Sequence, residues 1–167
     1  HIYYVETNHL QHNELISFNQ FILDLKLNFF DSIIQMDNKY TYSVSSKSGK
    51  GILNFPKHKF YSKLYYNGKW FNNTIPVQLG AITSFRSEYY GDSYNPITQN
   101  FYVQNEFQLE SYLRFDIFFT MQVNNLRIFL KMNHFNQFDR YGGYFVTPYY
   151  PAQKKVLDLG VRWYFFN

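Results

Sequence analysis

The sequence of 167 residues predicts an all-β fold, a transmembrane antiparallel up-and-down β-barrel of which about seven or eight strands are present. Three observations predict it. Long segments alternate apolar and polar residues with a period of two. The connections between these segments are alternately short and long, as in barrels of the outer membrane. Aromatic residues make up 23% of the chain, and many lie beside the short connections.

The first predicted strand, Ser17–Phe30, alternates for about a dozen residues, where roughly five or six suffice for an ordinary strand. Its apolar positions share one face: Phe21, Leu23, Leu25, Leu27 and Phe29. The same alternation predicts six further strands: Ile33–Val44, Lys59–Phe71, Ile75–Tyr89, Ser111–Val123, Leu126–Met132 and Lys155–Phe166. The initial "HIYYV" could be the stub of an eighth. A soluble β-sandwich would alternate too, but its edges rarely carry rings beside every tight turn.

Short and long connections alternate along the chain. The short ones are Asp31–Ser32, Asn72–Thr74 and Asn124–Asn125, and the long ones are Ser45–His58, Tyr90–Glu110 and Asn133–Lys154. This asymmetry is typical of outer-membrane barrels, which have turns in the periplasm and loops outside. Rings near the short turns predict an aromatic girdle at the membrane interface: Phe29, Trp70, Trp163 and Phe165.

Composition excludes several classes of function. The net charge is +4, but Lys and Arg are scattered singly, which argues against a nucleic-acid partner. Without cysteine there is no thiolate metal site and no Cys nucleophile. His9 and His12, in "NHLQHNE", are a weak candidate pair of metal ligands because no acidic or thiol partner stands at ligand spacing. We therefore predict no metal, no cofactor and no enzymatic activity, with a hydrolase site near the outer rim, as some small barrels have, as a remote alternative.

The charged residues of the predicted strands fall mainly on the face opposite the apolar one. These residues are predicted to line the pore: Lys26, Lys63, Lys69, Arg86, Glu88, Arg114, Asp116, Arg127, Lys131, Asp158 and Arg162. One interpretation is a weakly cationic wall that favours anions. The other is that the charges pair across strands and fill the barrel interior. The loop "DRYGGYFVTPYYP", with Gly142 and Gly143, could fold inward as a constriction or outward as a binding surface.

The chain closes with "DLGVRWYFFN", in which Asp158, Gly160, Trp163 and Phe165 fit the C-terminal signal of outer-membrane proteins. The barrel-assembly machinery recognises that signal as an unpaired strand edge. Such recognition works by strand addition: exposed main-chain groups form hydrogen bonds with the partner, and the aromatic rings enter pockets.

Three stretches carry a family resemblance: "YYGDSYNPITQNFYVQNE" (89–106), "RIFLKMNHFNQ" (127–137) and "YFVTPYYPAQKKVLDLGVRWYFF" (144–166). They resemble the C-terminal part of the "Putative porin" family of Bacteroidetes-type outer membranes. The resemblance implies passive diffusion of ions or small polar solutes across the bacterial outer membrane. It also implies lipid and the barrel-assembly machinery as partners. Because family members are longer, it implies that the chain is one domain, the C-terminal part of a larger barrel. A non-conducting scaffold with additional outer-membrane subunits is the alternative.

Overall fold

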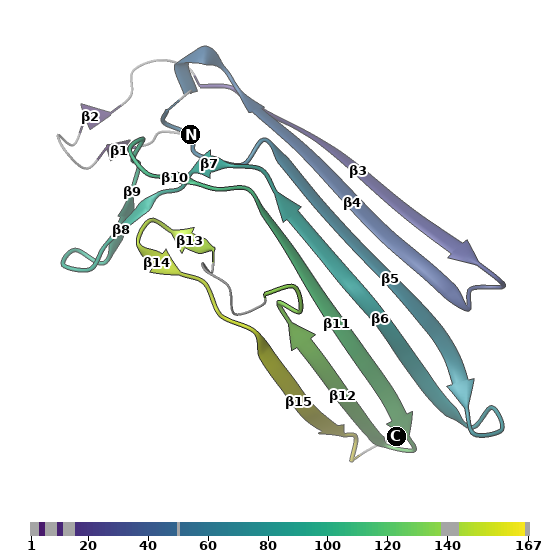
Figure 1. Ribbon diagram of the computed structural model, residues 1–167. Coiled ribbons are helices and arrows are strands. Elements are labelled where there is room, and N and C mark those ends of the chain that lie inside the picture. The colour runs from purple at the N-terminus through teal and green to yellow at the C-terminus, as the bar shows by residue number, and fades with distance from the viewer. Residues whose placement is uncertain (1–3, 6–9, 12–15, 50, 138–143, 166–167) are drawn as a thin grey trace.

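An antiparallel sheet of seven long strands dominates the computed structural model, which describes residues 4–5, 10–11, 16–49, 51–137 and 144–165. The order across the sheet follows the order along the chain, so the strands form an up-and-down meander (Figure 1). From one edge to the other they are β3 (Phe18–Phe29), β4 (Ile34–Ser45), β5 (His58–Trp70), β6 (Ile75–Arg86), β11 (Tyr112–Val123), β12 (Leu126–Asn133) and β15 (Val156–Trp163).

The seven strands predicted from alternation are confirmed, and most boundaries agree within one or two residues. The largest correction concerns β6, which ends at Arg86 rather than at Tyr89. Tyr4–Val5 (β1) pairs with Leu10–Gln11 (β2) in a separate small sheet and adds no eighth strand to the main one. The last strand, β15, likewise ends at Trp163 and does not include Tyr164 and Phe165, which the prediction had placed in it; Phe166 lies outside the described residues. No helix in the described part of the chain is long and apolar enough to cross a membrane.

Short hairpin turns join the strands at one end of the sheet, at residues 30–33, 71–74 and 124–125. Asn72, Asn73 and Asn124 adopt left-handed backbone angles there, with φ of 55°, 62° and 50°. Asparagine tolerates this region better than most residues, which explains why these positions reverse the chain. The described C-terminal residues lie at the same end, as Figure 1 shows.

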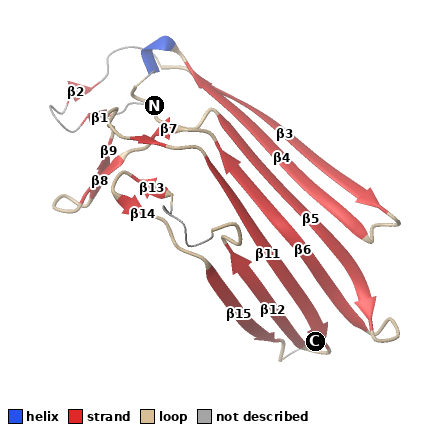
Figure 2. Cartoon of the chain, viewed as in Figure 1, coloured by secondary structure: helices blue, strands red, loops and turns tan. Residues whose placement is uncertain are grey.

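The described parts of the long connections, 46–49, 51–57, 87–111, 134–137 and 144–155, gather at the opposite end (Figure 2). They contain a short 3-10 helix, η1 (Lys47–Gly49), and three small antiparallel pairs of strands. The pairs are β7 (Tyr89–Tyr90) with β10 (Gln108–Leu109), β8 (Ser93–Asn95) with β9 (Asn100–Tyr102), and β13 (Phe145–Thr147) with β14 (Tyr150–Pro151). We call this end the loop end and the other the turn end.

The loops between β6 and β11 and between β12 and β15 form a small core of their own. Leu109 is 1% exposed, and the Phe107 ring lies 5.5 Å from that of Phe145 between centroids. The Thr147 hydroxyl donates a hydrogen bond to the backbone carbonyl of Asp92. Partial burial raises the pKa of the Asp92 carboxyl above its usual value. These contacts hold the two loops together above the sheet.

The main sheet itself is a single open layer. Val77 and Leu109 are the buried hydrophobic residues of the described chain, and Leu109 belongs to the loops. β3 and β15 form the two edges, and neither pairs with a further described strand on its outer side. The sheet therefore exposes both of its faces.

Candidate functional site

The strand register divides the main sheet into two chemically distinct faces. Directly paired residues share a face, and alternate residues along a strand share it too. Every charged residue of the seven strands lies on one face, which we call the polar face. They comprise ten cations and four carboxylates: Lys26, Lys39, Lys59, Lys63, Lys69, Arg86, Arg114, Arg127, Lys131 and Arg162, with Asp24, Asp37, Asp116 and Asp158.

The opposite face, the apolar face, carries no charged residue within the seven strands. Its large side chains are nevertheless exposed; Leu159 is 71% and Val161 is 60% accessible. The same holds across the sheet for Phe21, Leu23, Leu25, Leu64, Leu79, Leu113, Leu130 and Leu157. A contiguous exposed apolar surface of this extent marks contact with a membrane or another apolar partner.

The four residues predicted as a girdle gather at the turn end. Phe29, Trp70 and Trp163 are at the last positions of β3, β5 and β15, on the apolar face, and Phe165 follows β15. All four are exposed. The rings of Trp163 and Phe165 are nearly parallel, with centroids 5.5 Å apart. These rings therefore lie beside the turns, and their role as a girdle at the membrane interface stays a prediction.

Ion pairing on the polar face converges on Asp116. This carboxylate is fully buried, and its Oδ2 lies 3.3 Å from Arg114 Nε and 3.4 Å from Lys131 Nζ. Its Oδ1 accepts a hydrogen bond of 2.9 Å from the backbone N–H of His134. The other eight cations of the polar face have no carboxylate within ion-pair distance among the described residues. The other three carboxylates of the strands stand directly opposite cations in the register: Asp24 opposite Lys39, Asp37 opposite Lys26 and Lys63, and Asp158 opposite Lys131. Even if every carboxylate offsets one cation, six of the ten cations keep an unneutralised charge.

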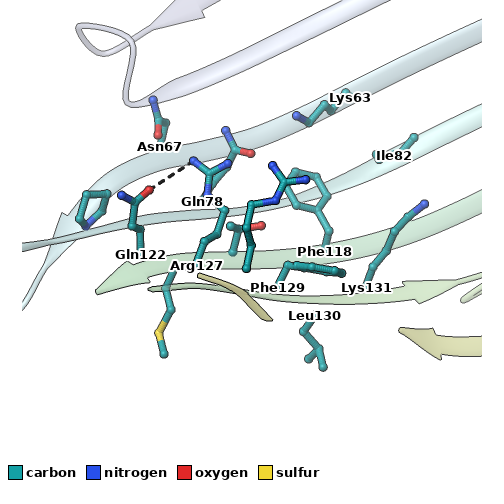
Figure 3. Close-up of a pocket in the computed structure, with 14 residues that line it drawn as sticks. Lys63, Asn67, Gln78, Ile82, Phe118, Gln122, Arg127, Phe129, Leu130 and Lys131 are labelled. Atoms are coloured by element: carbon teal, nitrogen blue, oxygen red, sulfur yellow. Dashed lines mark hydrogen bonds between the residues drawn. The ribbon is translucent and has the colours of Figure 1, made fainter. Parts of the chain in front are cut away.

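A hollow of about 480 Å³ lies on the turn side of the polar face (Figure 3). Its lining includes four cations, Lys63, Arg127, Lys131 and Arg162, and no carboxylate. Gln122 accepts a hydrogen bond from Arg127, and the Lys63 ammonium stands 4.9 Å from the centroid of the Phe118 ring. Figure 3 shows Gln78, Gln122 and Arg127 converging from neighbouring strands, while Leu130 points to the other side of the sheet.

A second hollow, of about 530 Å³, lies on the same face toward the loop end. It too is lined by four cations, Lys39, Lys59, Arg86 and Arg114, and by no carboxylate. The two hollows give the polar face a positive surface along most of the strand length. A water-exposed wall of this kind attracts anions.

The loop that could fold inward or outward begins, in its described part, over the polar face. Tyr144 stacks on Tyr112 of β11, with ring centroids 3.7 Å apart. Arg86 donates a 2.6 Å hydrogen bond to the carbonyl of Phe145. The first described residues of this segment, Tyr144 and Phe145, therefore lie over the polar face, while Thr147 packs on the neighbouring loop; Gly142 and Gly143 lie outside the described residues.

The last strand holds the predicted assembly-signal residues at an edge of the sheet. Asp158 accepts a hydrogen bond from the Asn133 side chain on β12. Gly160 faces Phe129 of the same strand, and a Cβ at position 160 would lie 2.0 Å from Cζ of that ring. Glycine leaves room for this ring, and a larger residue would force the ring to move, a packing reason that the signal pattern alone did not provide.

Sequence reasoning missed some residues and misplaced one. Lys59 is on the polar face, and its spacing of four from Lys63 was the available signal. The position of Tyr144 over Tyr112 depends on a loop fold that no local pattern encodes. Glu88, predicted within a strand, follows the end of β6 and is exposed at the loop end. His9 and His12 lie outside the described residues, within which no group of three His, Asp or Glu could hold a metal.

The fold and its two faces define a class of protein, an antiparallel sheet of membrane-barrel type with one apolar and one charged face. The chain belongs to the "Putative porin" family, whose model matches residues 1–167. No curated protein and no solved structure matches the sequence significantly. Family membership supports a porin-like, channel-type role rather than an enzymatic one.

Proposed function

We propose that this protein forms a water-filled, anion-favouring pore in the bacterial outer membrane for ions and small polar solutes. The observation that carries the proposal is the separation of the faces: all fourteen charged residues of the strands lie on one side. In water the apolar face would have to be covered, whereas lipid covers it without cost. The charged face then borders the aqueous interior.

Anion preference follows from the charges that remain unpaired. Ten cations oppose four carboxylates on the polar face, and Asp116 offsets only Arg114 and Lys131. Both hollows of this face are lined by cations and lack carboxylates. Rings of basic residues favour anions in pores, and the field is strongest where low-dielectric walls confine it.

In a membrane, both edges of the sheet have to be paired. The hydrocarbon offers no hydrogen-bond partner to the free backbone groups of β3 and β15, so spanning strands must close into a barrel. Further strands, of this protein or of additional subunits, would complete the wall. The residues Asp158, Gly160, Trp163 and Phe165 on and beside β15 suit recognition of that edge by the barrel-assembly machinery.

Planar-bilayer recording tests the proposal. Purified protein that migrates as a heat-modifiable, folded barrel should give stepwise conductance. In a salt gradient, the reversal potential should have the sign of anion selectivity. A folded barrel that inserts without conductance would contradict the proposal and favour the non-conducting scaffold. Cation selectivity would contradict the assignment of the charged face to the pore.

A further inference from the structure

The hollow at the loop end differs from the rest of the polar face because cations and tyrosine rings surround it together. Strands β3 to β6 and β11 form its floor, and Tyr144 of the inward-folded loop forms part of its wall. Its tyrosine rings are Tyr61, Tyr112 and Tyr144, Phe60 and Phe85 also line it, and further hydroxyl and amide groups come from Thr41, Ser84 and Gln20. A volume of about 530 Å³ is within the range of small-molecule sites.

Like charges stand directly opposite each other in this hollow. Lys59 of β5 and Arg86 of β6 are direct partners in the strand register, and like charges in such positions repel. Neither has a carboxylate within ion-pair distance among the described residues. Arg114, which also lines the hollow, shares the single charge of Asp116 with Lys131. An anion between these groups would offset the repulsion.

The Arg86 guanidinium is held in place, yet it retains an unused donor. It donates hydrogen bonds to the Tyr89 hydroxyl at 3.1 Å and to the Phe145 carbonyl at 2.6 Å. The rings of Tyr89 and Tyr144 lie 5.2 and 5.4 Å from its central carbon. Its Nε is buried and has no hydrogen-bond partner among the described residues. A buried donor without a partner is costly unless a ligand or water satisfies it.

The tyrosines indicate what the uncharged part of the ligand should be. The parallel stack of Tyr112 on Tyr144 fixes a ring wall beside the cations. Rings supply flat apolar area at a low cost in conformational entropy, and their hydroxyl groups donate hydrogen bonds. An inorganic anion would interact only with the cations of such a site, whereas an organic anion with a ring would contact both the cations and the tyrosine rings.

We infer that the loop-end hollow is a binding site for a small organic anion, one with a phosphate or carboxylate group on a flat ring-bearing body. The cations Lys59 and Arg86 hold the charged group, and the tyrosine rings contact the body. This site deepens the proposed function, since it rests on the polar face being open to water, and it would concentrate such solutes beneath the loops.

Calorimetric titration of the whole protein in detergent with phenyl phosphate tests the inference without requiring conduction. Phenyl phosphate should bind more tightly than inorganic phosphate, and phenol should bind negligibly. Lys59→Gln and Arg86→Gln should each weaken binding about tenfold or more, since a hydrogen bond to a charged group contributes about 1.5–3 kcal/mol. Lys26→Gln, the same charge loss on the same face outside the hollow, should leave binding within about twofold of wild type.

The outcomes separate this site from the pore. Equal losses in Lys26→Gln and Lys59→Gln would show a diffuse charge effect and overturn the site, as would unchanged binding in both Lys59→Gln and Arg86→Gln. Because Arg86 also holds the loop, Lys59→Gln decides if Arg86→Gln fails to fold. Binding of phenyl phosphate without conductance would contradict the pore and support the binding site. Conductance without binding would support the pore and contradict the binding site.

Discussion

The two faces of the main sheet are built from the same strands but obey opposite rules. On the apolar face large aliphatic and aromatic side chains are exposed, and no charge interrupts them. On the polar face charged and amide side chains border two hollows, and the one fully buried carboxylate is held by two cations. Strand propensity alone would not separate the residues in this way, whereas a sheet with lipid on one face and water on the other, as we propose, requires it.

Substituting Leu159 by Arg should give the largest effect. Leu159 lies in the middle of β15 on the apolar face and is 71% exposed. A charge there would enter hydrocarbon, so the free energy of unfolding should fall by roughly 2–4 kcal/mol if the site is near the bilayer midplane. Urea unfolding in lipid vesicles, followed by tryptophan fluorescence, measures it. Thr120→Arg, a mid-strand change on the polar face, is the matched control, and an equal loss there would refute the face assignment.

Asp116→Asn should reduce stability by a smaller amount. The change leaves Arg114 and Lys131 without their shared counter-charge, but both cations are about one-third exposed, which weakens the pair. We therefore expect a loss of about 1–2 kcal/mol, below that of a fully buried pair. Asp37→Asn removes a carboxylate of the same face that has no ion pair among the described residues. Equal destabilisation by the two variants would mean that Asp116 is no special anchor of the polar face.

Gly160→Ala tests whether the polar face is packed as well as charged. The added methyl would collide with the Phe129 ring, so we expect a loss of about 1 kcal/mol, at the lower end for overpacking. Without the ring the added methyl has room, so Gly160→Ala should cost less free energy of unfolding in the Phe129→Ala background than in the wild type. If the losses of unfolding free energy caused by the two substitutions are simply additive, the Phe129 ring does not pack on Gly160.

Arg162→Gln should hardly change stability, because Arg162 is exposed and has no carboxylate within ion-pair distance among the described residues. Losing one cation from the turn-side hollow should instead reduce anion selectivity, read as a shift of the reversal potential toward zero. A clear loss of stability with unaltered selectivity would place Arg162 away from the aqueous path.

The smallest effect concerns the loops, outside both faces. The pKa of Asp92 is raised by partial burial, so folding favours its protonated form. Its contribution to loop stability is present below the unfolded pKa and is lost as the pH rises through the raised folded pKa. The protection of amides 144–151 against hydrogen exchange, measured relative to the intrinsic rate at each pH, should thus fall slightly over that window, and Asp92→Asn should abolish this change in protection. Persistence of the change in Asp92→Asn would assign it to another group.

Alternation made the main sheet predictable from the sequence because it is a local property. Strand positions, turns and faces all follow from a period of two, which is why Leu159 and Arg162 were assigned to the correct opposite faces. Contacts between side chains of different strands, or of a strand and a loop, were not predictable in the same way. Asp116 meets Lys131 only through the register of β11 with β12, and Tyr144 reaches Tyr112 only because a long loop turns inward.

The measurement that tests the central claim most directly is a single-cysteine scan along β11, since the chain has no cysteine of its own. Cysteines at positions 119–122 of protein reconstituted in vesicles would be treated with a charged, water-soluble maleimide. We predict reaction at the positions of Thr120 and Gln122, and protection at those of Phe119 and Met121. Reaction at all four positions, or the reversed pattern, would contradict a sheet with one face in lipid and the other in water.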